Sequence, residues 1–210
     1  MKIGEMKAQA LTLMFPQATV KFDETSDEEI IRAIYEMKSN PNFESILQGS
    51  VGAINRAFSY IESRGLSIVK CTDIVGSTCE RRGGKILLPF GEDFLLVNRV
   101  LLHINDRTYE LDFEVENGSI LTEYRQNGVY TVVYKEKIPR ITRTTSDAYE
   151  PQLPVGIAEC IPYFIVSDLA REENGEMARY ALDRFEKAIK SIGENQAPCH
   201  ECFQIIYRWD

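Results

Sequence analysis

The residues with the most potential for chemistry lie near the C-terminus, in the run Cys199-His200-Glu201-Cys202. Thiolates and imidazoles bind zinc, but a tetrahedral site takes four ligands, and one such pair does not close it. Cys71 and Cys79 could supply the rest, but their spacing is not that of a zinc knuckle. A redox Cys-x-x-Cys motif opens a helix after a strand, whereas this one follows Pro198 in a polar tail. We therefore expect free thiols here and no metal site.

The remaining polar residues also give no catalytic pattern. His103 sits in an apolar strand-like run and is predicted to be a hydrogen-bonded sheet residue. A nucleophilic triad needs a base within reach of a serine or cysteine, and the sequence has no G-x-S-x-G, H-E-x-x-H, Walker A or G-x-G-x-x-G motif. Four carboxylates alternate with apolar residues along one strand and are predicted to form its wet face: Glu110, Asp112, Glu114 and Glu116. No catalytic, cofactor-binding or metal-binding residue is predicted, and the protein is not expected to be an enzyme.

Composition narrows the classes of partner. The chain has 210 residues, a formal net charge of −8 and a pI of about 5.0. This acidity disfavours a nucleic-acid surface, which usually shows as a basic patch. The first residues, Met1 to Met14, include charged side chains and lack the apolar core of a signal peptide. No apolar stretch approaches the ~18 residues that span a bilayer. The odd set of five cysteines fits free thiols in a reducing cytoplasm.

Helical periodicity dominates both ends of the chain. Helices are predicted over 2–14, from Ser26 onwards, over 42–63 and over 176–192. The third is the clearest, because its apolar residues form one stripe at spacings of three and four: Leu47, Val51, Ile54, Phe58 and Ile61. A further helical region opens at Leu153-Pro154, and Pro162 should either kink it or start a new helix.

The middle of the chain has the two-residue period of strands. Strand-like runs begin at Leu66 and continue to Lys137, with one strand predicted over 109–116. Asn117-Gly118 and Asn127-Gly128 are hairpin signals, and Asn105-Asp106 is a weaker one. Successive hairpins make a meander. The predicted fold class is α+β, an α-helical bundle with an antiparallel β-meander inserted between its N-terminal and C-terminal helices. The predicted segments are 1–64, 65–152, 153–193 and a tail, 194–210.

The tail contains an aromatic-rich run, which includes the only tryptophan of the chain. Tryptophan, tyrosine and arginine are favoured interface anchors, and a terminus is free to move. The tail either docks on its own sheet as an edge strand or inserts into a neighbouring subunit. Its candidate partner-contacting residues are Phe203, Ile205, Ile206, Tyr207 and Trp209.

Four segments of the sequence resemble a known family. Leu153 to Glu173 starts a helix at Leu-Pro, and Met177 to Ile189 follows an Asn-Gly turn. Ile54 to Glu62 reads Ile-Asn-Arg-Ala-Phe-Ser-Tyr-Ile-Glu, and Leu88-Pro89 precedes Gly-Glu-Asp-Phe94 and a strand. With these segments the chain resembles the head–tail adaptor, or connector, proteins of tailed bacteriophages over roughly residues 26–192.

The resemblance implies a structural part without catalysis. Such adaptors form a ring, usually of twelve copies, below the portal protein in the virion neck, and they dock a tail or stopper protein. They are synthesised in the bacterial host cytoplasm, bind no membrane, and meet DNA only as the passing content of the channel. C-terminal segments in the family often reach toward the portal, which makes Phe203 to Trp209 the candidate contact.

Two other functions remain open. The first is a small-molecule or peptide binding module, in which the apolar face of the sheet lines a pocket with Tyr109, Phe113, Tyr124, Tyr130 and Tyr134. The second is a small enzyme that uses a carboxylate pair or the residues Cys199, His200 and Cys202.

Overall fold

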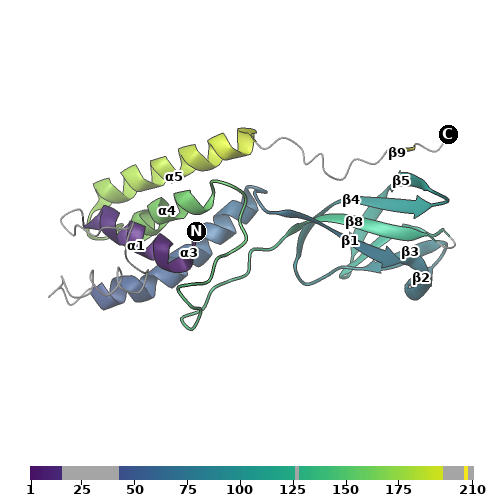
Figure 1. Cartoon of the computed structure of the whole chain (residues 1–210), viewed down its shortest axis with the longest axis horizontal. Coiled ribbons are helices and arrows are strands. Elements are labelled where there is room, and N and C mark those ends of the chain that lie inside the picture. Colours follow the sequence, from purple (N-terminus) through teal and green to yellow (C-terminus); the bar gives the residue numbers. More distant parts are fainter. Residues whose placement is uncertain (16–42, 126–127, 196–205, 208–210) are drawn as a thin grey trace. The chain divides into compact units, whose positions relative to one another are not determined.

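The chain folds as two compact units. A computed structural model describes residues 1–15, 43–125, 128–195 and 206–207 (Figure 1). One unit combines Met1–Leu66 with Ile138–Gln196, and the other combines Ser67–Lys137 with Ala197–Asp210. We call them the helical unit and the β unit. The helical unit is thus assembled from two separate stretches of the chain, whereas most of the β unit is contiguous.

The helical unit contains four described helices (Figure 1): α1 (Ile3–Met14), α3 (Phe43–Ser63), α4 (Ile161–Leu169) and α5 (Gly175–Asn195). A 3₁₀ turn, η2 (Ala158–Cys160), leads into α4. The helices predicted over 2–14, 42–63 and 176–192 correspond to α1, α3 and α5. Pro162 lies in the first turn of α4, where its missing N–H costs no hydrogen bond, so it starts a helix and kinks none. The helix predicted from Ser26 lies outside the described residues.

The core of the helical unit joins all four helices. Ile54, Phe58 and Ile61, from the predicted stripe of α3, are fully buried in one cluster with Ile3 of α1 and Phe185 of α5. Each large apolar side chain buried in this way stabilises the fold by about 1.5–3 kcal/mol. The rings of Phe164 and Phe185 meet edge to face, with centroids 4.9 Å apart. The apolar period of the sequence therefore identifies the faces that pack.

The irregular connection 138–152, which we call the strap, packs in the helical unit. The amides of Ile3 and Gly4 donate to the carbonyls of Tyr149 (2.9 Å) and Asp147 (2.8 Å). These contacts satisfy two amides in the first turn of α1 that have no partner within the helix. The Lys7 ammonium lies 2.6 Å from the Asp147 carboxylate. The strap thus holds the start of α1, although the sequence alone grouped it with the strands in the segment 65–152.

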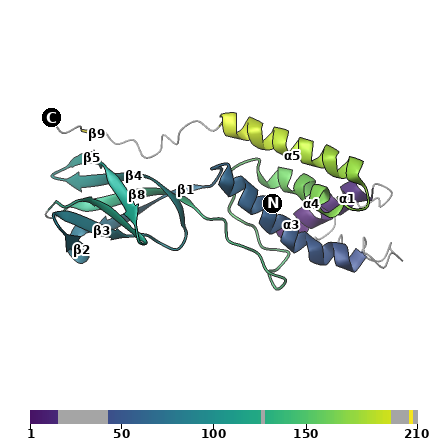
Figure 2. The same cartoon turned by 180° about the vertical axis from the view of Figure 1, so that it is seen from behind.

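The β unit contains two sheets, seen from opposite sides in Figures 1 and 2. The five-stranded sheet has the order β1 (Val69–Val75), β8 (Val129–Glu136), β4 (Phe94–Ile104), β5 (Arg107–Leu111) and β9 (Ile206–Tyr207). The four-stranded sheet has the order β2 (Glu80–Arg82), β3 (Lys85–Pro89), β7 (Ser119–Glu123) and β6 (Phe113–Glu116). A 3₁₀ turn, η1 (Gly76–Thr78), lies between β1 and β2. All pairings are antiparallel except that of β5 with β9.

The predicted fold class, an α-helical bundle with an inserted meander, is therefore wrong. The structure is mixed, with four described helices and two sheets, and only some of its strands pair with their neighbours in the chain. The signals at Asn105-Asp106 and Asn117-Gly118 do close hairpins, and all four residues have positive φ. Asn127-Gly128 joins no hairpin, because β7 pairs with β3 and β6 while β8 pairs with β1 and β4. The strand predicted over 109–116 is two strands, which separate at Asp112 and enter different sheets.

The two sheets share one core. It contains Ile86, Leu88 and Ile120 from the four-stranded sheet, with Leu102 and Tyr130 from the five-stranded sheet. Tyr130 is fully buried, yet its hydroxyl accepts a hydrogen bond from the Arg125 amide (2.8 Å) and donates to the Glu123 carbonyl (3.0 Å). Burial raises the pKa of Tyr130, because a phenolate would be poorly solvated there. This ring therefore fixes the segment after β7 as it leaves the four-stranded sheet.

Candidate functional site

His103 is held in a chain of polar contacts across the five-stranded sheet. Its Nε2 lies 2.8 Å from Thr131 Oγ1, and its Nδ1 lies 2.9 Å from Thr108 Oγ1. The Thr131 hydroxyl donates its one proton to the Asp73 carboxylate at 2.5 Å, so it accepts from Nε2–H. When neutral, His103 then accepts from Thr108 at Nδ1. Both ring nitrogens are thus satisfied by side chains of the sheet, in agreement with the expected hydrogen-bonded histidine.

The described cysteines are spread over separate sites. Cys71 is exposed on β1, Cys79 is half-buried and Cys160 is buried in the helical unit. Burial raises the pKa of the Cys160 thiol, which lies 3.2 Å from the Gly156 carbonyl and can donate to it. Within the described part of the chain, no group of three His, Cys, Asp or Glu side chains could hold a metal ion. The candidate ligands Cys199, His200 and Cys202 lie outside the described residues.

Two residues of the predicted tail contact are described. Ile206 and Tyr207 form β9, which pairs in parallel with β5, with Ile206 opposite Thr108 and Tyr207 opposite Tyr109. This pairing corresponds to the first of the two expectations, a tail that adds an edge strand to its own sheet. Phe203, Ile205 and Trp209 lie outside the described residues.

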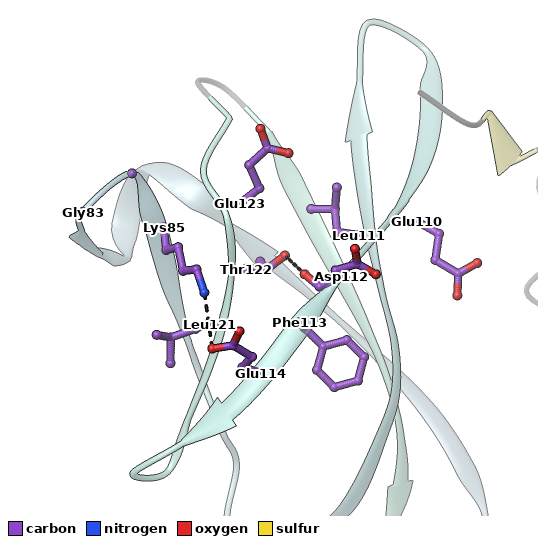
Figure 3. Close-up of a pocket in the computed structure, with 11 residues that line it drawn as sticks. Gly83, Lys85, Glu110, Leu111, Asp112, Phe113, Glu114, Leu121, Thr122 and Glu123 are labelled. Carbon is purple, nitrogen blue, oxygen red and sulfur yellow. Dashed lines mark hydrogen bonds and ion pairs between the residues drawn. The ribbon is translucent and has the colours of Figure 1, made fainter. Parts of the chain in front are cut away.

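A cleft of about 450 Å³ lies where the chain passes from β5 to β6 (Figure 3). The Thr122 hydroxyl donates to the Asp112 carbonyl at 2.8 Å, which holds the point where the strands separate. The Lys85 ammonium lies 3.3 Å from the Glu114 carboxylate across the cleft. Apolar side chains complete the lining: Leu111, Phe113 and Leu121. The sequence could not locate this cleft, because its walls come from two sheets that the alternating pattern does not separate.

The cleft is acidic as well as apolar. Its lining contains four carboxylates, those of Glu110, Asp112, Glu114 and Glu123, against one ammonium group. Glu123 is paired with Arg125 at 2.6 Å, so part of this charge is neutralised locally. A cleft with these properties favours a cationic group on an apolar stem, such as a lysine side chain.

The aromatic side chains that the sequence analysis placed around a pocket lie mostly in the core. Tyr109, Tyr130 and Tyr134 are buried in the core between the sheets. Phe113 and Tyr124 pack partly against the same core, and only Phe113 lines the cleft. The alternating pattern correctly placed these rings on an apolar face, and a second sheet covers that face.

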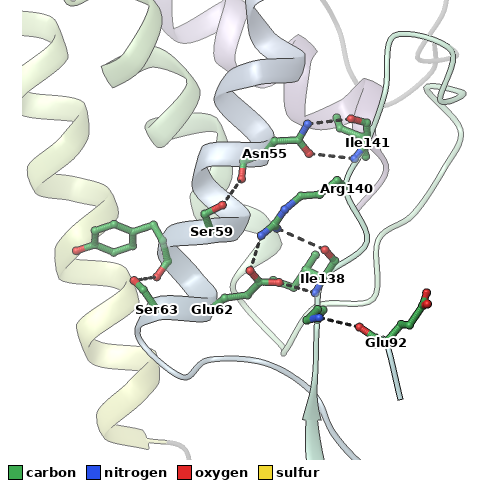
Figure 4. Close-up of polar contacts among 10 residues, drawn as sticks. Asn55, Ser59, Glu62, Ser63, Glu92, Ile138, Arg140 and Ile141 are labelled. Carbon is green, nitrogen blue, oxygen red and sulfur yellow. Dashed lines mark hydrogen bonds and ion pairs between the residues drawn. The ribbon is translucent and has the colours of Figure 1, made fainter. Parts of the chain in front are cut away.

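In the helical unit, α3 holds the strap through polar side chains (Figure 4). The Asn55 amide both donates to the Ile141 carbonyl (2.8 Å) and accepts from the Ile141 amide (3.0 Å). The Glu62 carboxylate accepts from the Ile138 amide (2.7 Å) and pairs with Arg140. Ile138 and Ile141 are buried in the helical core. The strap therefore has a defined conformation without helix or strand.

The helical unit also exposes large apolar side chains. Val155 is 96% exposed in the turn before η2, and Gly156 holds that turn with φ +82°. Tyr180 of α5 is 57% exposed, and its hydroxyl accepts from Arg184 Nε at 3.0 Å. Both tyrosine and arginine are enriched at the energetic centres of protein interfaces. These residues are available for contact with another chain.

No protein-family model matches the chain, and no curated protein matches it. Among the described residues, no helix has the length and apolar character needed to cross a membrane. The function must therefore be argued from the sequence resemblance and from the surfaces above.

Proposed function

We propose that this protein is a structural subunit without catalytic activity, namely a bacteriophage head–tail adaptor. In this role it forms a ring below the portal protein in the virion neck and offers a docking surface to a tail or stopper protein. DNA passes the ring as channel content, and the acidic balance of the chain suits a wall that does not bind DNA tightly.

The observation that carries this proposal is the packing together of three of the four segments on which the resemblance rests. Residues 54–62 lie in α3, residues 153–173 include η2 and α4, and residues 177–189 lie in α5. All three segments contribute to one buried cluster, in which Phe58, Ile165 and Phe185 are members. Segments that are far apart in sequence thus pack into one core, which supports a common structural role for them.

Ring closure needs a head-to-tail contact, in which one patch of each subunit meets a different patch of the next. The exposed Val155 and Tyr180 are candidates for one of these patches. A contact of this kind gains binding energy from apolar anchors that lose their water on association. We therefore expect Val155→Asp and Tyr180→Asp to weaken assembly without unfolding the helical unit.

Light scattering after size-exclusion chromatography tests the proposal on the full chain, alone and mixed with purified portal rings. The expected result is a ring or a portal-bound assembly that the Val155→Asp and Tyr180→Asp variants lose. Lys187→Ala is the matched control, because Lys187 is exposed on α5 and its ammonium pairs with Asp183 of the same helix. Failure of the full chain to bind portal at any concentration would refute the adaptor role.

The cleft of Figure 3 favours a second candidate function, a peptide-binding module. Its three apolar residues and its surplus of carboxylates suit an extended peptide that contains lysine. Titration of the full chain with a short lysine-containing peptide distinguishes the two functions. Binding that Leu121→Asp abolishes, together with no portal binding, would favour the module.

A further inference from the structure

Tyr180 and Arg184 form an exposed pair on α5. Tyr180 is 57% exposed, and Arg184 is exposed one turn further along the helix. The Arg184 Nε–H donates to the Tyr180 hydroxyl at 3.0 Å, and the guanidinium carbon lies 5.5 Å from the centre of the Tyr180 ring. The nearby Asp183 carboxylate pairs with Lys187 at 2.7 Å, and no other carboxylate of the described residues pairs with Arg184. The remaining N–H groups of Arg184 are therefore available to a carboxylate, which a guanidinium binds through two parallel hydrogen bonds.

The cleft of Figure 3 has the complementary features. Phe113 and Leu121 are half-buried and supply apolar lining. Asp112 is exposed between β5 and β6, and within the described part of the chain its carboxylate forms no ion pair, whereas Glu114 lies 3.3 Å from Lys85. The cleft thus combines apolar surface with a carboxylate that is available to a cation. A guanidinium held beside an aromatic ring matches both parts.

We propose that the cleft of one copy of this chain receives Tyr180 and Arg184 of the next copy. The Arg184 guanidinium then binds the Asp112 carboxylate, and the Tyr180 ring packs on Phe113 and Leu121. This inference rests on the proposed ring, and it names the second patch that the ring contact needs. The pair belongs to the helical unit and the cleft belongs to the β unit, so the contact is head-to-tail, the type that closes rings.

Charge favours a second copy as the occupant of the cleft. The chain has a net charge of −8, so two copies repel each other unless a cation of one meets a carboxylate of the other. Arg184 and Asp112 each lack an ion-pair partner within the described part of their own chain, and association of two copies supplies both partners at once. A free lysine-containing peptide would fill the cleft and leave Tyr180 and Arg184 exposed.

Charge reversal tests the contact on the full-length chain. Arg184→Glu brings two carboxylates together and Asp112→Arg brings two guanidinium groups together, so each variant alone should associate about tenfold or more weakly than the unmodified chain. A mixture of the two variants should recover association, because the reversed charge of one then meets the reversed charge of the other. Sedimentation velocity over a concentration series, with and without portal rings, measures the association.

The controls lie outside the proposed contact. Lys190→Glu changes an exposed residue of α5 about 120° around the helix from Arg184, and Glu92→Arg changes an exposed residue before β4. Both should associate as the unmodified chain does. If the reversals at Arg184 and Asp112 also do so, the inference is overturned and the ring remains.

The other outcomes separate this inference from the adaptor role. A mixture that does not recover association would overturn the inference, and recovery only when Arg184→Glu and Asp112→Arg are combined in one chain would indicate a contact within that chain. Copies that associate but do not bind portal would refute the adaptor role alone. A chain that stays monomeric with and without portal would refute both.

Photo-cross-linking gives a second readout that leaves Arg184 and Asp112 unchanged. A photoreactive phenylalanine replaces Glu114, which is exposed and lines the cleft. Irradiation in a mixture with isotope-labelled unmodified chain should produce a cross-link to the labelled peptide that contains Tyr180, as seen by mass spectrometry. The same group at Leu96, which is 55% exposed on β4, should give no such product. A cross-link to Tyr180 of the same chain only, or none to that peptide, would overturn the proposal.

Discussion

Replacement of Asn55 by alanine should weaken the attachment of the strap to α3. Asn55 makes two reciprocal hydrogen bonds to the backbone of Ile141, at 2.8 and 3.0 Å. Ile141 is buried, so water cannot replace these bonds without disturbing the core. The alanine variant therefore leaves one N–H and one C=O without a partner in the interior of the helical unit.

The expected loss follows from these two bonds. A hydrogen bond contributes about 0.5–1.5 kcal/mol net, and a buried group without a partner costs about 1–3 kcal/mol. Alanine recovers up to about 0.5 kcal/mol through its higher helix propensity. We expect the free energy of unfolding of the helical unit to fall by about 2 kcal/mol, which lowers its melting temperature by roughly 4–8 °C. Asn55→Asp should lose at least as much, because an ionised carboxylate cannot donate to the Ile141 carbonyl.

Urea unfolding followed by circular dichroism at the helix signal measures this change. Ser59→Ala is the matched control. Ser59 is exposed on the same helix, and its hydroxyl donates a hydrogen bond to the Asn55 carbonyl of that helix at 3.1 Å. That control should change stability by less than about 0.5 kcal/mol. Equal midpoints for Asn55→Ala and Ser59→Ala would show that the strap contributes nothing through this contact.

Three further predictions concern single side chains. Gly76→Ala should destabilise the β unit by about 1–3 kcal/mol in urea unfolding, because an added Cβ would lie 2.7 Å from the buried Tyr130 ring. Gly175→Ala is its control, since a Cβ there meets open space and the change should be neutral or stabilising. Tyr130→Phe should lower the free energy of unfolding by about 1–2 kcal/mol, because it removes the partner of the Arg125 amide. An absorbance titration of the unmodified chain should show that Tyr130 ionises above the ordinary tyrosine range, since burial raises its pKa. Cys160 should be alkylated more slowly than Cys71 at pH 8, because burial raises its pKa and lowers its thiolate fraction. The folded state holds the Cys160 proton more tightly, so this contribution to stability is complete below the pKa of the unfolded thiol and is lost as the pH rises through the folded pKa. A Cys160 alkylation rate equal to that of Cys71 would contradict the burial argument.

The helices could be predicted from sequence because one-sided apolar stripes, and the residues that cap or end a helix, are local signals. Ile54, Phe58 and Ile61 recur on one face of α3, and that face is the one buried. From sequence, Pro162 predicted either a kink within a helix or the start of a new one, because its fixed φ is compatible with both. In the structure it lies in the first turn of α4.

The arrangement of the strands could not be predicted in the same way. Alternation runs without a break from Tyr109 to Glu116, although the chain changes sheets at Asp112. The two-residue period reports which face is apolar, and it carries no information about which neighbour a strand pairs with. The cleft between β5 and β6 was invisible for the same reason. The burial of Leu101 and Val133 was also hidden, because both residues read as ordinary members of apolar strands.

The discontinuous helical unit has a consequence for synthesis on the ribosome. Ser67–Lys137 are contiguous and can pair soon after they emerge, because the strands other than β9 lie within this stretch. Residues of α1 and α3 are made first, yet their partners in α4 and α5 are translated after the whole β segment. The apolar faces of α1 and α3 therefore remain without their partners while roughly a hundred further residues are synthesised, a period of about 5–20 s. During that interval these apolar faces are exposed to water, which makes the nascent chain prone to aggregate.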